Sequence, residues 1–371
     1  MRFMLVAALC PCAFGLNPAL DINQYAHKDW TVGEGFSKGS VYAIAQTPDG
    51  YLWLGTEFGV ARFDGIRSVE WRPPNGEHLP GGRVRSLLAA RDGRLWIGTD
   101  EGLASWKDGA LTHYAELAGK SVLSILEDHE AAIWVAAWAV QNTGGRLCTI
   151  RGGRVECYGN DGRLGNGIDG LYEDRRGHLW AGNVDGVWRW TPEPAKFFPM
   201  PIVTSSFAEG DGGELFITTL DGVKTLIDDQ PGPYLVRAAG RQTKFGKLLR
   251  DHDGGLWVGT YDGGLLHVHH GRTDRFTHSD GLSSDSILYL FEDREGNIWV
   301  GTRNGLDRFR EFAVPAITEK QGLSNSYAGS ILQARDGSIW LGTLNGLDRW
   351  KNGNIVVYGK RERLPDTPPG P

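Results

Sequence analysis

The chain has 371 residues, a net charge of −6 at pH 7 and a sequence pI near 5.9. Its 40% apolar and 23% charged residues are typical of a folded globular protein and argue against a disordered one. The lack of a basic excess argues against binding to a nucleic-acid backbone, and no apolar run reaches the roughly 18 residues of a transmembrane helix. The 53 glycines and 14 tryptophans instead indicate many short strands joined by tight turns.

The first residues predict an export signal. Residues 1–2 form a short charged segment, residues 3–9 an apolar one, and residues 13–15 supply small side chains at the spacing that a signal peptidase reads. We therefore expect residues 1–15 to be a signal peptide and the mature protein to be periplasmic. The alternative is an apolar N-terminal strand.

One pattern then recurs along the chain. It consists of an alternating apolar strand, an Asp-Gly turn, a strand centred on tryptophan, Gly-Thr, a loop and a further strand that begins at glycine; residues 41–63 and 287–309 are the clearest copies. Eight units about forty residues apart cover nearly the whole chain, with Phe216 replacing tryptophan in the fifth. The repeat tryptophans are Trp53, Trp96, Trp134, Trp180, Trp257, Trp299 and Trp340.

Each unit has the two-residue alternation of half-buried strands, with Asp-Gly and Gly-Gly pairs as hairpin turns. Because no unit can bury both faces of its sheet alone, neighbouring units must stack. A period near forty with four strands per unit predicts an all-β fold, a β-propeller of four-stranded blades. We expect the repeat tryptophans to pack between blades rather than to bind a ligand.

The repeat also carries a family resemblance. Its form, D-x-x-G-x-[IL]-W-[IVL]-G-T-x-x-G-[LV], preceded by Gly-Leu-Ser at residues 281–283 and 322–324, resembles the two-component regulator propeller repeat over roughly residues 24–360. It differs from WD40, which would place Asp directly after Trp. The resemblance implies an exported sensor region of a bacterial receptor, in which two seven-bladed propellers and a β-sandwich precede a membrane helix and a histidine kinase, diguanylate cyclase or DNA-binding output domain.

The N-terminal segment resembles the outermost strand of a blade, since residues 24–31 precede Gly35-Phe-Ser37 as residues 274–278 precede Gly281-Leu-Ser283. By analogy with the family, we expect residues 16–313 to form a seven-bladed propeller in which strand 24–31 closes the seventh unit, around Trp299. Residues 314–371 would hold the first repeat of a second propeller and a truncated linker. The alternative is one eight-bladed ring. Both a fragment of a longer receptor and a free-standing sensor domain fit the sequence.

Three motifs resemble known sites but fit turns or linkers better. Residues 35–39 match a nucleophile elbow, yet no helix follows Ser37. Residues 165–170 match the dinucleotide fingerprint but precede a strand instead of following one. Residues 251–255 open like a calcium loop, but Leu256 stands where that loop needs glycine.

The run His267-Val-His269-His270 places two imidazoles on one strand face, which could hold a metal. No third ligand is evident nearby in the sequence. We therefore predict no metal site, no cofactor and no catalytic residue.

The cysteines are consistent with an oxidising compartment. Cys148 and Cys157 flank a turn at Gly152-Gly153, and pairing outward from that turn sets them opposite each other, so a cross-strand disulfide is feasible. The alternative is two free thiols. Cys10 and Cys12 would leave with the signal peptide.

In propellers, the loops that enter the innermost strands and those after the second strands gather at one mouth of the central channel. The third unit carries an insertion there, residues 138–145, which is either a binding loop or simply a variable one. The predicted ligand-binding residues at this mouth mix carboxylates, amides, an arginine and aromatic rings, which suits sugar hydroxyls and C–H faces. They are Lys38, Glu57, Phe58, Asp100, Glu101, Trp138, Asn183, Asp185, Asp221, Tyr261, Asp262, Asp285, Arg303 and Asn304.

These features predict a non-enzymatic extracytoplasmic sensor that binds an oligosaccharide or similar polar ligand, with its signalling output domain in a longer relative. No nucleic-acid partner and no membrane span are expected, and a homodimer is one option. The alternatives are a streptogramin-lyase-like enzyme or a protein–protein scaffold. A lyase needs a histidine base and usually a divalent metal near the channel axis, and none of the ten histidines maps convincingly there.

Overall fold

The computed structural model describes residue 16 and residues 20–139, 145–159, 161–165, 167–192, 194–200, 203–237, 244–269, 271–311, 317–351 and 354–359. The predicted signal peptide with Cys10 and Cys12, residue His270, most of the loop after Trp138 and the final linker lie outside the described residues. The described chain folds into eight four-stranded antiparallel sheets, without an α-helix. The predicted all-β fold with four-stranded blades is confirmed.

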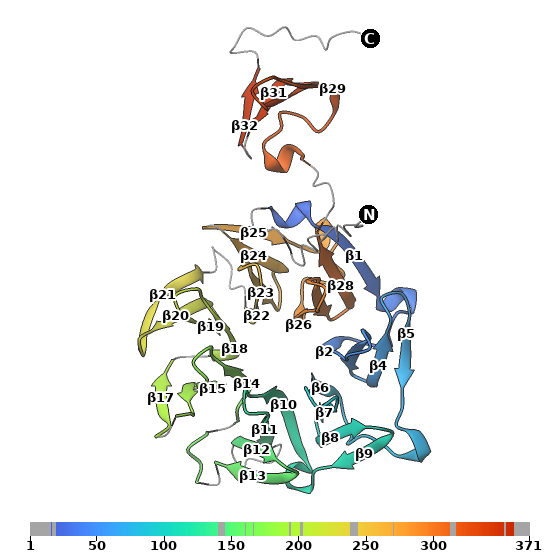
Figure 1. The fold of residues 1–371 in the computed structure, drawn as a ribbon, viewed down its shortest axis with the longest axis vertical. Coiled ribbons are helices and arrows are strands. Elements are labelled where there is room, and N and C mark those ends of the chain that lie inside the picture. Colours follow the sequence, from blue (N-terminus) through green and yellow to red (C-terminus); the bar gives the residue numbers. More distant parts are fainter. Residues whose placement is uncertain are drawn as a thin grey trace, which may run out of the picture. The chain divides into compact units, whose positions relative to one another are not determined.

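The chain divides into two units, one of residues 1–22 and 26–310 and one of residues 23–25 and 311–371. Seven sheets belong to the first unit and form a ring with the first strand of each sheet innermost (Figure 1). From the inner to the outer strand, blades one to seven are β2 (Val41–Gln46), β3 (Leu52–Thr56), β4 (Gly59–Phe63), β5 (Ser68–Trp71); β6 (Val84–Ala89), β7 (Leu95–Thr99), β8 (Gly102–Lys107), β9 (Ala110–His113); β10 (Lys120–Glu127), β11 (Ile133–Ala139), β12 (Gly145–Arg151), β13 (Arg154–Tyr158); β14 (Gly170–Glu173), β15 (Leu179–Asn183), β16 (Gly186–Arg189), β17 (Lys196–Pro199); β18 (Val203–Glu209), β19 (Leu215–Thr219), β20 (Gly222–Ile227), β21 (Gln230–Arg237); β22 (Phe245–Arg250), β23 (Leu256–Thr260), β24 (Leu265–His269), β25 (Arg272–Phe276); and β26 (Ile287–Glu292), β27 (Ile298–Thr302), β28 (Gly305–Arg310), β1 (Ala26–Thr31).

The seventh blade is completed by the start of the chain. Strand β1 pairs antiparallel with β28, from Ala26 opposite Arg310 to Thr31 opposite Gly305. Trp30 of β1 stacks on Trp299 of the same blade, with ring centroids 5.6 Å apart. Both ends of the ring are therefore held in one sheet.

The repeat motif explains how the blades pack. Trp53 is 3% exposed and lies in one apolar cluster with Val84 and Leu87 of the next blade, so the ring fills the gap between two sheets. The glycine that follows each such strand keeps the blades close. At Gly259, for example, a Cβ atom would lie 2.6 Å from Ile287 of blade seven, closer than packed atoms tolerate.

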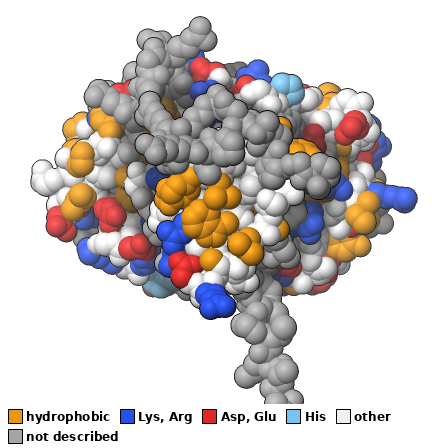
Figure 2. Space-filling view, turned by 90° about the horizontal axis from the view of Figure 1, so that it is seen from above, with side chains coloured by type: hydrophobic (Ala, Val, Ile, Leu, Met, Phe, Trp, Pro, Cys, Tyr) orange, Lys and Arg blue, Asp and Glu red, His pale blue; other side chains and the backbone are white. Residues whose placement is uncertain are grey.

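The second unit holds one sheet of the same kind, made of β29 (Ala328–Gln333), β30 (Ile339–Thr343), β31 (Gly346–Lys351) and β32 (Asn354–Tyr358). Its faces are bare where those of a ring blade are covered. Ile331 is 71% exposed, whereas Ile44, which has the same register position in blade one, is 1% exposed. Exposed apolar side chains also gather beside charged ones on the face shown in Figure 2.

Candidate functional site

One residue from each ring blade faces the central channel at the same height. The register identifies them, because each sits opposite the glycine or alanine near the end of the second strand; in blade five, Ser206 takes the place through its backbone hydrogen bond to Thr218. In blade order they are Ala43, Ser86, Ser124, Gly170, Ser206, Lys247 and Tyr289. All but Ala43 line a cavity of about 180 Å³ in the channel.

The serines of this layer tie neighbouring blades together. Ser86 Oγ donates to the carbonyl of Val122 on blade three at 2.9 Å. Ser206 Oγ accepts the N–H of Leu248 on blade six at 2.8 Å. Such bonds use the small polar side chains for closure and leave the larger ones available to a ligand.

Lys247 and Asp169 supply two charges at the channel cavity. The Lys247 ammonium makes no hydrogen bond or ion pair with any described residue; burial lowers its pKa, and the negative charge of Asp169 partly offsets that effect. Burial likewise raises the pKa of Asp169, with Lys247 acting in the opposite sense. Because each charge is desolvated and lacks a direct partner, a ligand that supplied hydrogen-bond acceptors to Lys247 and hydroxyl donors to Asp169 would be favoured.

Tyr261 connects this cavity to the predicted mouth. Its side chain is 38% exposed, and its ring lies over Gly246 at the start of β22, 3.0 Å from where a Cβ atom would stand. Burial raises the pKa of the Tyr261 hydroxyl, and the charge of Asp169 raises it further, so hydroxyl and carboxylate are near each other. Tyr261 is thus a predicted residue that the structure places beside the channel charges.

Several other predicted residues use their polar groups within the ring. Lys38 pairs with Glu70 of the outer strand β5 at 2.9 Å, and Asp221 accepts from Tyr234 of the outer strand β21 at 2.6 Å, so both point away from the channel. Others hold mouth loops or strands through hydrogen bonds. They are Glu57 with Tyr42, Asp100 with Arg83 and Arg85, Asn183 with Gly186, Asp262 with Lys244, Asp285 with His278, and Asn304 with Ser283.

The remaining predicted side chains are open to solvent. Phe58 and Trp138 are 65% and 48% exposed, and Trp138 packs against Gly167 of the next blade junction. Glu101, Asp185 and Arg303 are also exposed. With Tyr261, these groups offer aromatic and charged contacts around the mouth.

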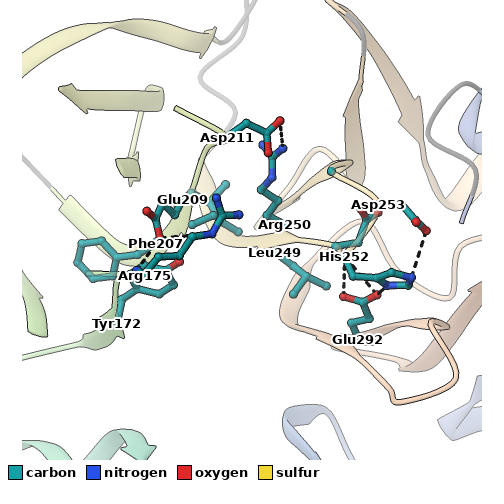
Figure 3. Close-up of a pocket in the computed structure, with 14 residues that line it drawn as sticks. Tyr172, Arg175, Phe207, Glu209, Asp211, Leu249, Arg250, His252, Asp253 and Glu292 are labelled. Atoms are coloured by element: carbon teal, nitrogen blue, oxygen red, sulfur yellow. Dashed lines mark hydrogen bonds and ion pairs between the residues drawn. The ribbon is translucent and has the colours of Figure 1, made fainter. Parts of the chain in front are cut away.

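A larger cavity, about 450 Å³, lies at the opposite end of the ring, which the sequence analysis did not single out (Figure 3). It is lined by the turns after the inner strands of blades four to six and by Glu292 at the end of β26. Its charged groups are paired across blades. Arg250 bonds Asp211 at 2.7 Å, the Arg175 N–H donates to Glu209 at 2.9 Å, and His252 bonds Glu292.

The same pairing links blades elsewhere around the ring. The His129 N–H donates to Glu173 at 2.9 Å, and the Arg294 N–H donates to Gln46 at 2.9 Å. A glutamate or glutamine at the end of the inner strand recurs in the sequence and is the signal that could have revealed this belt. Since its charges are already matched, we regard this end of the ring as a structural belt and the channel mouth as the binding site.

Two further predicted groups can be placed. Cys148 and Cys157 face each other across β12 and β13 and form a disulfide. The sequence showed no third ligand beside His267 and His269; the structure corrects this, because Asp274 lies within hydrogen-bond distance of His269. The β24–β25 hairpin folds Asp274 back against these histidines.

Comparison with known proteins supports the repeat assignment. The family profile described as Two component regulator propeller matches residues 35–58, 78–101, 241–262, 281–304 and 322–345. No curated protein matches the sequence. Among the described residues, no helix is long and apolar enough to cross a membrane.

Solved structures share the fold. The extracellular domain of a putative hybrid two component system from B. thetaiotaomicron has a TM-score of 0.67 and 21% identity, over 90% of this chain and 49% of that one. That of a putative one component system from the same organism has a TM-score of 0.65 and 20% identity, over 90% and 47%. This chain therefore spans about half the length of these relatives. A catalytically inactive virginiamycin B lyase from Staphylococcus aureus, solved with quinupristin, has a TM-score of 0.62 and 13% identity, over 78% and 100%.

Proposed function

Since this chain is built of two-component regulator propeller repeats, we propose that it is the extracytoplasmic, ligand-sensing propeller of a bacterial two-component-type signal transduction receptor. Similarity to the extracellular domains of two such systems supports this assignment. In this proposal, residues 1–15 direct export to the periplasm, and a signalling output domain in a longer receptor reads the bound state. The observation that carries ligand binding is the desolvated pair Asp169 and Lys247 at the floor of the channel mouth.

The ligand that suits this mouth is an oligosaccharide or a similar hydroxyl-rich molecule. The inner cavity, about 180 Å³, is smaller than the roughly 300 Å³ at which drug-sized pockets begin, so it would receive one end of the ligand only. Lys247 would donate to ring or hydroxyl oxygens and Asp169 would accept hydroxyl protons. The rest of the ligand would lie over the exposed rings of Tyr261 and Trp138.

Binding can be tested by thermal shift and calorimetry of the exported chain against plant and microbial oligosaccharides. A ligand present at one hundred times its dissociation constant should stabilise the fold by about 2.7 kcal/mol. Asp169→Asn and Lys247→Met should each weaken binding about 10- to 100-fold, because each removes a hydrogen bond to a charged group. Lys28→Met, at an exposed position on β1, is the matched control and should leave the affinity unchanged.

The outer part of the mouth needs its own variant. Alanine at Trp138, Tyr261 and Arg303 together should reduce affinity while preserving the melting temperature of the free protein. If the triple variant and the two channel variants all bound as well as the parent chain, the proposed face would be wrong.

We propose that the chain binds its ligand without converting it. The similarity to the virginiamycin B lyase, at 13% identity, concerns the fold alone. No histidine is among the described residues that line the channel cavity, whereas a lyase needs a proton acceptor near the reacting atoms. Mass spectrometry of a saturating ligand after prolonged incubation, with and without magnesium or calcium, should show it intact. Metal-dependent consumption would favour the lyase alternative.

The sheet of the second unit fits the first blade of a second propeller better than an eighth blade of one ring. The seven ring blades already close, since β1 completes blade seven and Val32 of the adjoining segment bonds Asn304 at 2.8 Å. Ile331 and Leu332, 71% and 65% exposed, stand where ring blades pack on a neighbour. We expect Ile331→Lys with Leu332→Lys to reduce aggregation of the chain without changing the melting of the ring. A loss of ring stability would instead support a single eight-bladed ring.

A further inference from the structure

Two histidines and one aspartate lie together in the outer half of blade six. His267 and His269 are two residues apart on β24 and so project from the same face of the sheet. Asp274 on β25 is the register partner of His267. The ligand atoms of the three side chains all lie within 4.8 Å of one another. We propose that these three residues form a binding site for a divalent transition-metal ion of the zinc type.

The geometry is close to what such an ion requires. The Nε2 atom of His269 is 2.7 Å from Oδ2 of Asp274, and the His267 and His269 rings are nearly parallel, with centroids 4.6 Å apart and planes inclined by 17°. Zinc binds imidazole nitrogen and carboxylate oxygen at roughly 2.0–2.2 Å, which separates the ligand atoms of a tetrahedral site by roughly 3.3 Å. Small side-chain rotations would bring the three groups to that separation, with the ion replacing the His269–Asp274 hydrogen bond.

The histidines are specific to blade six. In the other ring blades, the position opposite the central aromatic residue of the second strand carries arginine, serine or threonine: Arg62, Ser105, Thr149, Arg189, Thr225 and Arg308. Arg308 lies over the Trp299 ring as His267 stacks on Trp257, so a single histidine would suffice to keep that packing. Packing does not account for the second histidine two residues on, or for an aspartate beside both.

The surroundings favour nitrogen-binding metals and hold the ligands in place. His267 and His269 are 0% and 5% exposed, and the backbone N–H of Ile22 donates to Asp274 Oδ2 at 3.3 Å. Such an outer hydrogen bond orients a ligating carboxylate. Two imidazoles with one carboxylate suit zinc, cobalt, nickel or copper, whereas magnesium and calcium prefer sites made entirely of oxygen.

A metal here would have a structural consequence. Arg272 at the start of β25 bonds Asp21 at 2.6 Å, so the hairpin that carries the site also holds the segment that precedes the closure strand β1. An ion bridging β24 and β25 would fix this hairpin and, through it, the start of the chain. The site therefore acts on closure of the ring and is separate from the channel mouth.

The test uses the full chain, without a polyhistidine tag, after dialysis against a chelator. Calorimetry with Zn²⁺ should give one ion per chain, and Co²⁺ should produce the intense visible absorption of a tetrahedral site with nitrogen and oxygen ligands. Asp274→Asn and His269→Gln, which keep the side-chain volume, should each weaken Zn²⁺ binding roughly a hundredfold or more, since loss even of outer-shell partners costs 10- to 100-fold. His113→Gln, at an exposed histidine on β9, is the matched control and should bind Zn²⁺ as the parent chain does.

Far-ultraviolet circular dichroism of each variant shows whether it has folded. If the two ligand variants fail to fold, the Co²⁺ spectrum and stoichiometry of the parent chain decide alone. One ion per chain with a tetrahedral spectrum supports the site. Substoichiometric binding, or a folded Asp274→Asn variant with unchanged affinity, overturns it.

Discussion

The indole N–H of Trp134 donates to Oδ2 of Asp128, six residues earlier, at 2.7 Å. The same bond joins Asp174 to Trp180, Asp251 to Trp257 and Asp293 to Trp299, at 2.6 to 2.9 Å. The aspartate also caps its turn, since Asp128 Oδ1 accepts the N–H groups of Glu130 and Ala132. The repeat thus specifies one local unit, in which a single carboxylate fixes both the turn and the tryptophan that packs between blades.

Removing this carboxylate should be costly. Asp128→Ala leaves the buried Trp134 N–H and two turn N–H groups without their acceptor, so we expect the free energy of unfolding to fall by about 2–3 kcal/mol. Denaturant titration measures the loss. Asp128→Asn retains an acceptor oxygen and should lose less; equal losses in the two variants would contradict the hydrogen-bond explanation.

Blade two lacks the bond and offers the reverse experiment. Ala90 occupies the aspartate position, and Trp96 Nε1 is buried without a hydrogen-bond partner. The backbone turn is the same, with Ala90 N–H donating to Arg94 at 2.8 Å as Asp128 N–H donates to Ala132 at 3.0 Å. Ala90→Asp should therefore raise the free energy of unfolding by about 1 kcal/mol. Ala90→Asn tests whether the amide suffices, and a loss of stability in both would show that the site has no room for the longer side chain.

Asp100 gives the ring a specific response to acid. Burial alone would raise its pKa, but hydrogen bonds from Arg85 and Arg83 outweigh that effect and lower it to about 2. The unfolded chain therefore takes up a proton near pH 3.8 while the folded chain does not, so the stabilisation is complete above that pH and disappears as the pH falls towards 2.

After allowance for the partial exposure of the two arginines, we expect this group to contribute about 1–2 kcal/mol at neutral pH. The difference in unfolding free energy between the parent chain and Asp100→Asn should be present at pH 6 and much smaller at pH 2.5. A difference independent of pH would show that the carboxylate charge is unimportant.

The disulfide between Cys148 and Cys157 should stabilise blade three. Its cysteines are separated by 9 residues, and closing so short a loop in the unfolded chain is worth about 2–3 kcal/mol. The double variant Cys148→Ala with Cys157→Ala should lose this amount in denaturant titration under oxidising conditions. Under reducing conditions the parent chain should approach the variant, and a gap that persisted there would point to packing around buried Cys148.

The fold could be predicted because the repeat states it eight times. The tryptophan spacing and the turn residues were enough to predict the four-stranded blades. The channel charges were missed although a signal existed: Lys247 stands where most other blades carry alanine, serine or glycine. Asp274 could also have been found, because counting outward from the hairpin turn after His269 sets it opposite His267, as the same counting set Cys148 opposite Cys157.

The orientation of the mouth side chains was beyond such counting. Lys38 lies in a loop that enters an innermost strand, yet its ammonium pairs with Glu70 on the outermost strand. A long flexible side chain finds its partner through the three-dimensional arrangement of its blade, and no periodicity in the sequence encodes that choice.

The pairing of β1 with β28 has a consequence for biosynthesis. Ala26 leaves the ribosome early, and its partner Arg310 follows only after six complete blades have been translated. The N-terminal strand must therefore wait, extended and unpaired, while the chain emerges, and premature pairing of this strand with another blade would trap the wrong circle. Ring closure is a late event in folding that depends on the chain being translated as far as residue 310.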